Sequence, residues 1–304
     1  MIIGTVKEIW RYPVKSMGGQ TLAECTVGSL GIPGDRGWAL RDETTGEITN
    51  GKKIPLLMQS SARYREEPDS ETPSPVDMTL SNGSVIGSDQ PDVNEVISNL
   101  LGKEVSLWPL QPASNKAHYR RSSLMSRLIG FKVVRTQLPR ILRSKRVESE
   151  LRNLFSREPD EPIPDMTTLP PELLEFTSPL GTYFDAFPIH VLTTASLAAM
   201  ARVNPGAAWD VRRFRPNFLI EPESGLAELI EADWKGRSLR IGSVELKCEI
   251  PTMRCGMTMH AQKDLPKDPS VLRSIVKDAN QNLGIYASVS KEGTVFLNDP
   301  VELF

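Results

Sequence analysis

Short strand-like segments at regular spacing, with few helical stretches between them, are the feature that most constrains the fold of this chain. Alternating apolar and polar residues predict strands within residues 4–10, 34–40, 76–87, 104–110, 187–192, 215–222, 237–251 and 284–304. Asn82-Gly83 lies between two such flanks and predicts a hairpin, as does Gly242-Ser243. Evenly spaced short strands favour a mostly β, barrel-like fold with peripheral helices, in the α+β class.

Two helices are predicted from the residues at their ends. Asp268 at the N-cap and Pro269 at the first helical position predict a helix over the residues that follow. A shorter helix is expected to begin near Asp89 or Asp92 and to end just before Gly102. Both helices have the residue types that satisfy free backbone groups at helix ends.

The composition excludes several classes of protein. Of the 304 residues, 39% are hydrophobic and 24% are charged, which is ordinary globular usage and not that of a fibrous or disordered chain. No apolar run reaches the roughly 20 residues of a membrane-spanning helix, and the N-terminus lacks the pattern of a secretory signal. The three cysteines cannot all pair and none lies in a CxxC motif, so we expect a reducing, cytoplasmic location.

Charge is distributed unevenly along the chain. Residues 116–157 carry twelve Lys and Arg against two Glu, although the net charge of the whole chain is −2. A stretch rich in Pro and acidic residues follows, so residues 111–178 are predicted to be an insert or linker between an N-terminal β domain, 1–110, and a C-terminal domain, 179–304. The basic part is either a solvated insertion or an arm that contacts an anionic surface, for example through weak membrane contact.

Several familiar catalytic signatures are missing from the sequence. It contains no GxGxxG, GxxxxGK(S/T), GxSxG or HExxH motif. The three histidines, His118, His190 and His260, are not spaced as metal ligands. Zinc hydrolysis and a serine triad are therefore poor hypotheses. Nucleic-acid binding is not expected either, because the basic segment lacks interleaved aromatic residues and a recognised binding motif.

Two clusters near the N-terminus carry cations. Lys15 and Ser16 follow the first predicted strand, and a point charge beside a hydroxyl donor suits a phosphate; an ordinary surface pair is the alternative. Arg36 lies within residues 31–38, where glycines let a ligand approach the backbone closely. The alternative for this second cluster is a tight turn with an Asp–Arg ion pair.

A third cluster, RRFRPN, occupies residues 212–217. Its three arginines repel one another unless they are solvated or face an anion, and Asn217 can donate and accept hydrogen bonds beside Arg215. A helix start at Thr193-Thr194 would offer free amide groups to an anion. Capping of that helix alone also explains the two threonines.

The fourth cluster places Cys255 after Arg254, at the predicted end of a strand and before a glycine. A neighbouring cation favours the thiolate, which is a soft ligand for a redox metal. The alternative is a small buried hydrophobic residue, and that is the prediction for Cys25 and Cys248. His260, five residues later, is interpreted either as a proton relay or as a structural residue.

Together these segments resemble the MOSC-domain family, named for the C-terminal domain of molybdenum cofactor sulfurase. The resemblance is carried by YPVKS, GDRGW, RRFRPN, ADWKGRSLRIG and PTMRC in that order, and it covers residues 1–64 and 181–304. In layout the chain is similar to the amidoxime-reducing molybdoenzymes. The resemblance implies a β-barrel-like MOSC domain packed against an N-terminal β-barrel-like domain.

The resemblance also implies a molybdenum cofactor, in which a pterin dithiolene and one protein cysteine hold the metal. Cys255 matches the position of the metal ligand, and it is the predicted catalytic residue. The residues that match positions around the pterin and its phosphate are Lys15, Ser16, Arg36, Arg215 and Asn217, and the less securely matched ones are Thr193, Thr194 and Arg254.

The implied reaction is the molybdenum-dependent reduction of an N-hydroxylated or N-oxide small molecule. The chain lacks the four cysteines of a fused 2Fe–2S module, so electrons would come from a separate flavin or iron–sulfur protein. Around the metal position, residues 252–255 and 258–262 depart from the family pattern, which leaves the substrate open. The alternative function is a sulfur or cofactor carrier that uses a persulfide or a metal-binding thiol at Cys255.

Overall fold

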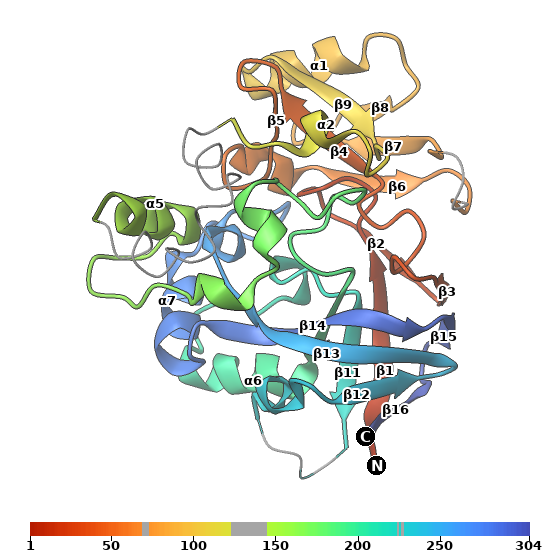
Figure 1. Ribbon diagram of the computed structural model, residues 1–304, viewed down its shortest axis with the longest axis vertical. Helices are drawn as coiled ribbons and strands as arrows, with labels where there is room; N and C mark the ends of the chain where they lie inside the picture. Colours follow the sequence, from red (N-terminus) through yellow and green to blue (C-terminus); the bar gives the residue numbers. More distant parts are fainter. Residues whose placement is uncertain (69–72, 123–144, 224, 226–227) are drawn as a thin grey trace.

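The molecule consists of a β-barrel and a smaller β-rich region, as the computed structural model in Figure 1 shows. The structure describes residues 1–68, 73–122, 145–223, 225 and 228–304. The two termini lie side by side, because the Met1 ammonium donates a hydrogen bond to the Leu303 carbonyl over 3.1 Å. The prediction of a mostly β fold with a barrel and few helices is confirmed.

Seven strands close the barrel, and the first of them comes from the N-terminus of the chain. In pairing order they are β1 (Ile2–Arg11), β11 (Phe218–Pro222), β10 (Ile189–Thr193), β14 (Asn282–Lys291), β13 (Val244–Met253), β12 (Ser238–Ile241) and β16 (Pro300–Leu303). β10 and β11 are parallel, and the other neighbours are antiparallel. Because β1 pairs with both β11 and β16, it closes a barrel whose other strands lie after residue 188.

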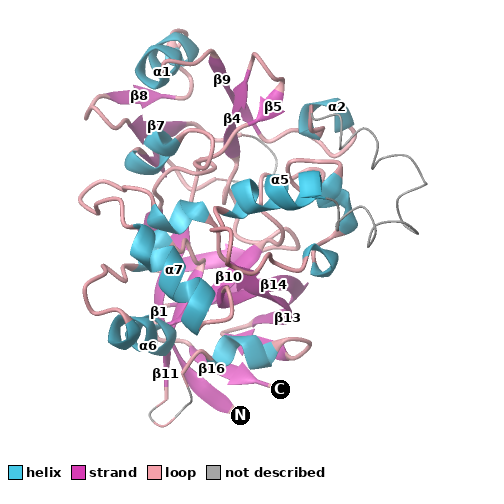
Figure 2. Ribbon diagram, turned by 90° about the vertical axis from the view of Figure 1, so that its left-hand side faces the viewer, coloured by secondary structure: helices cyan, strands magenta, loops and turns pink. Residues whose placement is uncertain are grey.

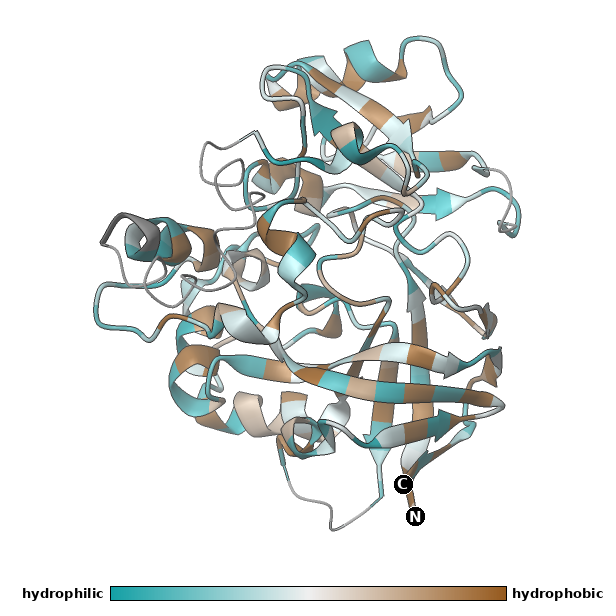
Figure 3. Cartoon of the chain, in the orientation of Figure 1, coloured by the Kyte–Doolittle hydropathy of each residue, from teal (hydrophilic) through white to brown (hydrophobic). Residues whose placement is uncertain are grey.

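Period-two alternation explains why these strands form a barrel. In β13, Val244, Leu246 and Cys248 are buried, whereas Glu245 and Lys247 are not. Figure 3 shows the same alternation of hydrophobic and hydrophilic residues along the long barrel strands. The buried set fills the barrel interior, and removal of this apolar surface from water is the main contribution to folding. The predicted hairpin at Gly242, which has a φ of +56°, joins β12 to β13 and is confirmed.

The N-terminal region contains two small sheets and a helix, packed around its own apolar core. The elements are β4 (Trp38–Asp42), β5 (Glu47–Ile48) and β9 (Val105–Pro109) in one sheet, β6 (Ser61–Tyr64), β7 (Val76–Thr79) and β8 (Val85–Gly87) in the other, and α1 (Val93–Leu101). The predicted hairpin at Asn82-Gly83 joins β7 to β8 and is confirmed. The predicted helix that ends just before Gly102 is also confirmed, with Asp92 before its first residue.

Two further pairings join the N-terminal sequence to the barrel. β2 (Gln20–Leu22) lies beside β1, and β3 (Glu24–Val27) pairs with β15 (Gly293–Phe296). The boundaries at residues 110 and 178 stay predictions. The structure adds that residues 2–11 belong to the barrel and not to the two small sheets.

Two helices cover the outside of the barrel, α6 (Thr194–Val203) and α7 (Pro269–Asp278), as Figure 2 shows. α7 begins as predicted, because the Asp268 side chain accepts a hydrogen bond from the Ser270 amide over 2.9 Å and Pro269 occupies the first helical position. A core of eight buried residues packs between these helices and the barrel wall. The short 3-10 helices are η1 (Pro55–Gln59), η2 (Met166–Thr168), η3 (Pro171–Leu174), η4 (Val211–Arg213), η5 (Ile230–Trp234) and η6 (Gly256–Met259).

The insert contains α2 (Lys116–Tyr119), α5 (Lys145–Phe155), η2 and η3. Much of its basic part, residues 123–144, lies outside the described residues, so the predicted contact with an anionic surface stays a prediction. Within the described part of the chain, no helix has the length and apolar character that a membrane crossing requires.

Candidate functional site

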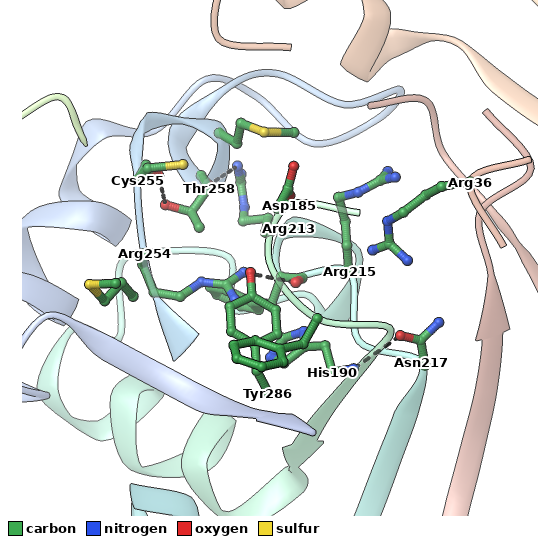
Figure 4. Close-up of a pocket in the computed structure, with 14 residues that line it drawn as sticks. Arg36, Asp185, His190, Arg213, Arg215, Asn217, Arg254, Cys255, Thr258 and Tyr286 are labelled. Carbon is green, nitrogen blue, oxygen red and sulfur yellow. Dashed lines mark hydrogen bonds between the residues drawn. The ribbon is translucent and has the colours of Figure 1, made fainter. Parts of the chain in front are cut away.

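A cavity that is open to solvent lies at one end of the barrel, beside the turn that precedes β4. Its walls come from that turn, from the segment before β10, from the approach to β11 and from the loop after β13. Figure 4 shows Cys255 on one side of the cavity and Arg36 on the other, with Arg215 between them. The lining residues are Arg36, Asp185, Phe187, His190, Arg213, Phe214, Arg215, Asn217, Met253, Arg254, Cys255, Met257, Thr258 and Tyr286.

Cys255 lies just beyond the end of β13, in extended backbone that leads into η6. Its carbonyl accepts hydrogen bonds from the amide and the hydroxyl of Thr258, each over 3.1 Å, which holds the loop in a tight turn. Cys255 is half-buried, whereas Cys25 and Cys248 belong to the barrel core, as predicted. Burial raises the pKa of both core thiols to about 12. Cys255 is therefore the thiol that faces the cavity.

Arg36 and Arg215 lie against the ring of Tyr12, although they are far apart in the sequence. Their guanidinium carbons are 5.2 and 4.2 Å from the ring centroid. The buried Asp35 carboxylate ties the same region together. It accepts hydrogen bonds from the Tyr12 amide over 2.8 Å, from Asn217 Nδ2 over 3.0 Å and from Arg36. One carboxylate thus holds Tyr12 together with Arg36 and Asn217, which come from two of the predicted clusters.

Two buried arginines at the cavity have spare hydrogen-bond donors. Arg215 donates one bond to the Met17 carbonyl, but its Nη2 is buried and has no partner among the described residues. Arg254 donates to the Phe214 carbonyl over 2.8 Å, while its Nε likewise has no partner there. Burial and the charge of Arg36 lower the pKa of Arg215 to about 10. Concentrated positive charge with unused donors is the environment that an anion stabilises.

Lys15 does not line the cavity, but its side chain binds a residue that does. Its ammonium donates to the Tyr183 carbonyl over 2.7 Å and to Asp185 Oδ1 over 2.8 Å. Burial lowers the pKa of Lys15. The charge and hydrogen bond of Lys15 hold the pKa of Asp185, whose side chain is partly exposed, well below its usual range. Asp185, which the sequence analysis missed, is therefore an ionised carboxylate fixed at the cavity wall.

His190 and Tyr286 also line the cavity and were missed, because both lie within buried barrel strands and resemble core residues in the sequence. Their ring centroids are 5.6 Å apart. Burial, with a contribution from the charge of Arg254, lowers the pKa of His190 well below its usual value. His190 Nε2 has no hydrogen-bond partner in the described structure. His260, the residue interpreted as a proton relay or a structural histidine, is absent from the lining, and its carbonyl accepts a bond from Arg213.

Arg213 uses its donors to brace the loop that follows Cys255. Its side chain donates to the carbonyls of Ala208, Thr258, His260 and Pro266 over 2.8 to 3.3 Å. The three close arginines of the third cluster therefore differ in their roles. Arg213 holds the protein backbone, whereas Arg215 has a donor left for a ligand.

Besides Lys15, three predicted residues are absent from the lining set. The Ser16 hydroxyl is buried and accepts a hydrogen bond from the Gly51 amide over 2.9 Å. Thr193 caps α6 by accepting from the Ser196 amide, and Thr194 is the first residue of that helix. The buried Glu231 carboxylate accepts from the Thr193 amide over 2.8 Å and from the Ser196 hydroxyl over 2.5 Å. A carboxylate of the chain itself thus occupies the helix start that was predicted to bind an anion.

Comparison with known proteins identifies the family. The model of the MOSC domain matches residues 181–302, and the model of the MOSC N-terminal beta barrel domain matches residues 3–104. This chain is a MOSC-domain protein. It is 26% identical over 324 residues to mitochondrial amidoxime reducing component 2 of Bos taurus. The alignment covers 98% of this chain and 83% of the relative.

Other similarities extend over the whole chain at lower identity. The human mitochondrial amidoxime reducing component 2 is 24% identical over 326 residues, with 98% of this chain and 83% of the relative covered. Among solved structures, the YUAD protein of Bacillus subtilis covers 99% of this chain and 95% of its own, with a TM-score of 0.41 and 11% identity. The predicted resemblance to the MOSC family and its N-terminal barrel is confirmed.

Proposed function

We propose that this cavity holds a molybdenum cofactor and that the protein is a molybdenum-dependent reductase of N-hydroxylated or N-oxide small molecules. One observation carries the proposal: the thiol of Cys255 shares the cavity with arginines whose buried nitrogens, Arg215 Nη2 and Arg254 Nε, have no partner within the described residues. Membership of the MOSC family and similarity to amidoxime reducing components support the choice of cofactor and reaction.

The donor set of the cavity fits this cofactor. A pterin phosphate is an anion that needs cations and N–H donors, which Arg36, Arg215 and Arg254 supply. Molybdenum held by a dithiolene takes a further soft ligand, and Cys255 is the one thiol in the lining. The proposed set leaves out Lys15, Ser16, Thr193 and Thr194, because their side chains or helix start are already engaged within the protein.

The residues of the chain orient the cofactor and shape access to it. Asp35 and Tyr12 hold Arg36 and Asn217 in place, so that the cations are positioned before any ligand arrives. Lys15 keeps the carboxylate of Asp185 at the wall. When bound, the cofactor supplies two-electron oxygen-atom transfer, which no amino-acid side chain can perform. A separate flavin or iron–sulfur protein is proposed as the electron donor, and the cytoplasm as the location.

Metal and pterin analysis tests the proposal. The full chain, produced in a host supplied with molybdate, is expected to hold about one molybdenum and one pterin per protein, and to reduce benzamidoxime with reduced methyl viologen as electron donor. Cys255→Ala is expected to abolish the reduction, while Cys25→Ala, a control in the barrel core, retains it. A protein without molybdenum that carries cyanide-labile sulfur on Cys255 would refute the enzyme and favour the carrier alternative.

A further inference from the structure

The last residue of helix α5 and the two residues that follow it, 155–157 of the insert, dock on the loop that carries Cys255. Arg157 is buried, with 6% of its surface exposed. Its Nη2 donates to the Arg254 carbonyl over 2.9 Å, its Nε to Gln281 Oε1 over 3.3 Å, and its Nη1 to the Phe155 carbonyl over 3.0 Å. One guanidinium thus joins the insert to two separate segments of the barrel domain.

One of the two hydrogen bonds to the barrel domain holds the residue before Cys255, and the other holds Gln281, which contacts that same residue. The carbonyl that Arg157 holds belongs to the peptide bond between Arg254 and Cys255, which is planar, so its orientation also fixes the Cys255 amide. The Arg254 amide donates to the Gln281 carbonyl over 2.9 Å. Arg157 and Gln281 therefore hold the two sides of Arg254 within a single network. A planar guanidinium with five donors can reach three acceptors at once, which an ammonium on a flexible chain cannot do in the same geometry.

A close contact on the other side of Cys255 completes the docking. A Cβ at Gly256 would lie 2.2 Å from Ser156 Oγ and 3.0 Å from Ser156 Cβ, so the insert packs where a larger residue would not fit. Arg273 of α7 fixes the same segment from outside, because it donates to the Ser156 carbonyl and pairs with Glu161 over 2.7 Å. The insert is thereby anchored on both neighbours of Cys255.

We infer that Arg157 is a positioning residue, through which the insert sets the orientation and exposure of the Cys255 thiol. This inference rests on the proposed function for its role in catalysis. The hydrogen bonds and contacts that support it belong to the chain itself. Without the guanidinium fork, the loop at residues 254–256 opens more often and Cys255 reaches solvent more readily.

Alkylation of Cys255 by iodoacetamide in the cofactor-free full chain, followed by peptide mass spectrometry, measures this exposure. In Arg157→Gln the loop loses the hydrogen bond at the Arg254 carbonyl and Gln281 loses the one at its side chain. The alkylation rate at Cys255 is therefore expected to rise about five-fold or more over the wild type. Arg157→Lys keeps the positive charge but loses the planar guanidinium, so the alkylation rate at Cys255 is expected to rise similarly. Gly256→Ala, which displaces Ser156, provides an independent variant with the same expected direction.

The matched control is Arg121→Gln, since Arg121 also lies in the insert and donates to two backbone carbonyls, those of Leu173 and Phe176, away from the Cys255 loop. Its rate is expected to equal that of the wild type, and circular dichroism and thermal melting confirm that each variant is folded. A wild-type rate in Arg157→Gln, or in Arg157→Lys, overturns the inference. Because no cofactor is present in this assay, its result is independent of whether the proposed molybdenum chemistry is right.

Discussion

Asp35→Asn tests whether one buried carboxylate holds the cation side of the cavity together. The Asp35 side chain is fully buried and accepts from Arg36, from the Tyr12 amide over 2.8 Å and from Asn217 Nδ2 over 3.0 Å. Asparagine has one acceptor oxygen where the carboxylate has two, so its amide group must face one of these donors. The Arg36 guanidinium, 11% exposed, would also lose its ionic partner.

The expected loss is large because the ion pair is shielded from water. Removing one partner of a buried pair costs about 3–5 kcal/mol of unfolding free energy, which in a chain of this size corresponds to a fall in melting temperature of about 5–8 °C. Asp89→Asn is the matched control, because Asp89 binds Arg65 through two hydrogen bonds on the exposed surface. It is expected to leave the melting temperature nearly unchanged.

Calorimetry or circular dichroism of the three proteins measures the difference. The Asp35→Asn protein is also expected to retain less cofactor, since Arg36 and Asn217 lose the group that orients them. A fall in melting temperature no greater than that of Asp89→Asn would refute the reasoning about the carboxylate.

Three further predictions concern individual side chains. A thiol reagent is expected to modify Cys255 alone in the native protein and all three cysteines in urea, because Cys25 and Cys248 are buried; a second reactive native thiol would contradict this. Because burial and the charge of Arg254 depress the pKa of His190, the unfolded chain binds a proton below about pH 6.5 that the native chain does not. The free energy of unfolding from urea titrations should therefore fall between pH 7 and pH 5, and an unchanged slope in His190→Gln would show that His190 is not responsible. Asp268→Ala should lower the stability by about 1 kcal/mol through loss of the α7 cap, and an unchanged urea midpoint would contradict that role.

The elements with local signals were predictable from the sequence. The N-cap of α7 at Asp268, the hairpin turns at Gly83 and Gly242 and the core positions of Cys25 and Cys248 depend on neighbouring residues alone. The closure of the barrel by β1 was not predicted, because it depends on pairing with strands more than 200 residues away, which alternation does not specify.

The residues that line the cavity were predictable only in part, because some of them are brought there by long-range contacts. Arg215 and Cys255 stand out as a charged cluster and a thiol before a glycine, and both line the cavity. Asp185 has no local signal, since its role appears only when Lys15, 170 residues earlier, contacts it. The contact of the Glu231 carboxylate with the start of α6 is likewise not predictable from the sequence, because it forms only when the helix and η5 pack together. Long-range contacts decide which of several plausible polar residues face a ligand.

The environment of the metal offers the most direct test of the central claim, that Cys255 and the surrounding cations hold a molybdenum cofactor. X-ray absorption at the molybdenum edge counts the sulfur atoms bound to the metal. The wild-type protein is expected to show one more sulfur ligand per molybdenum than Cys255→Ser. An identical sulfur shell in the two proteins, or wild-type protein that binds no molybdenum at all, would contradict the claim.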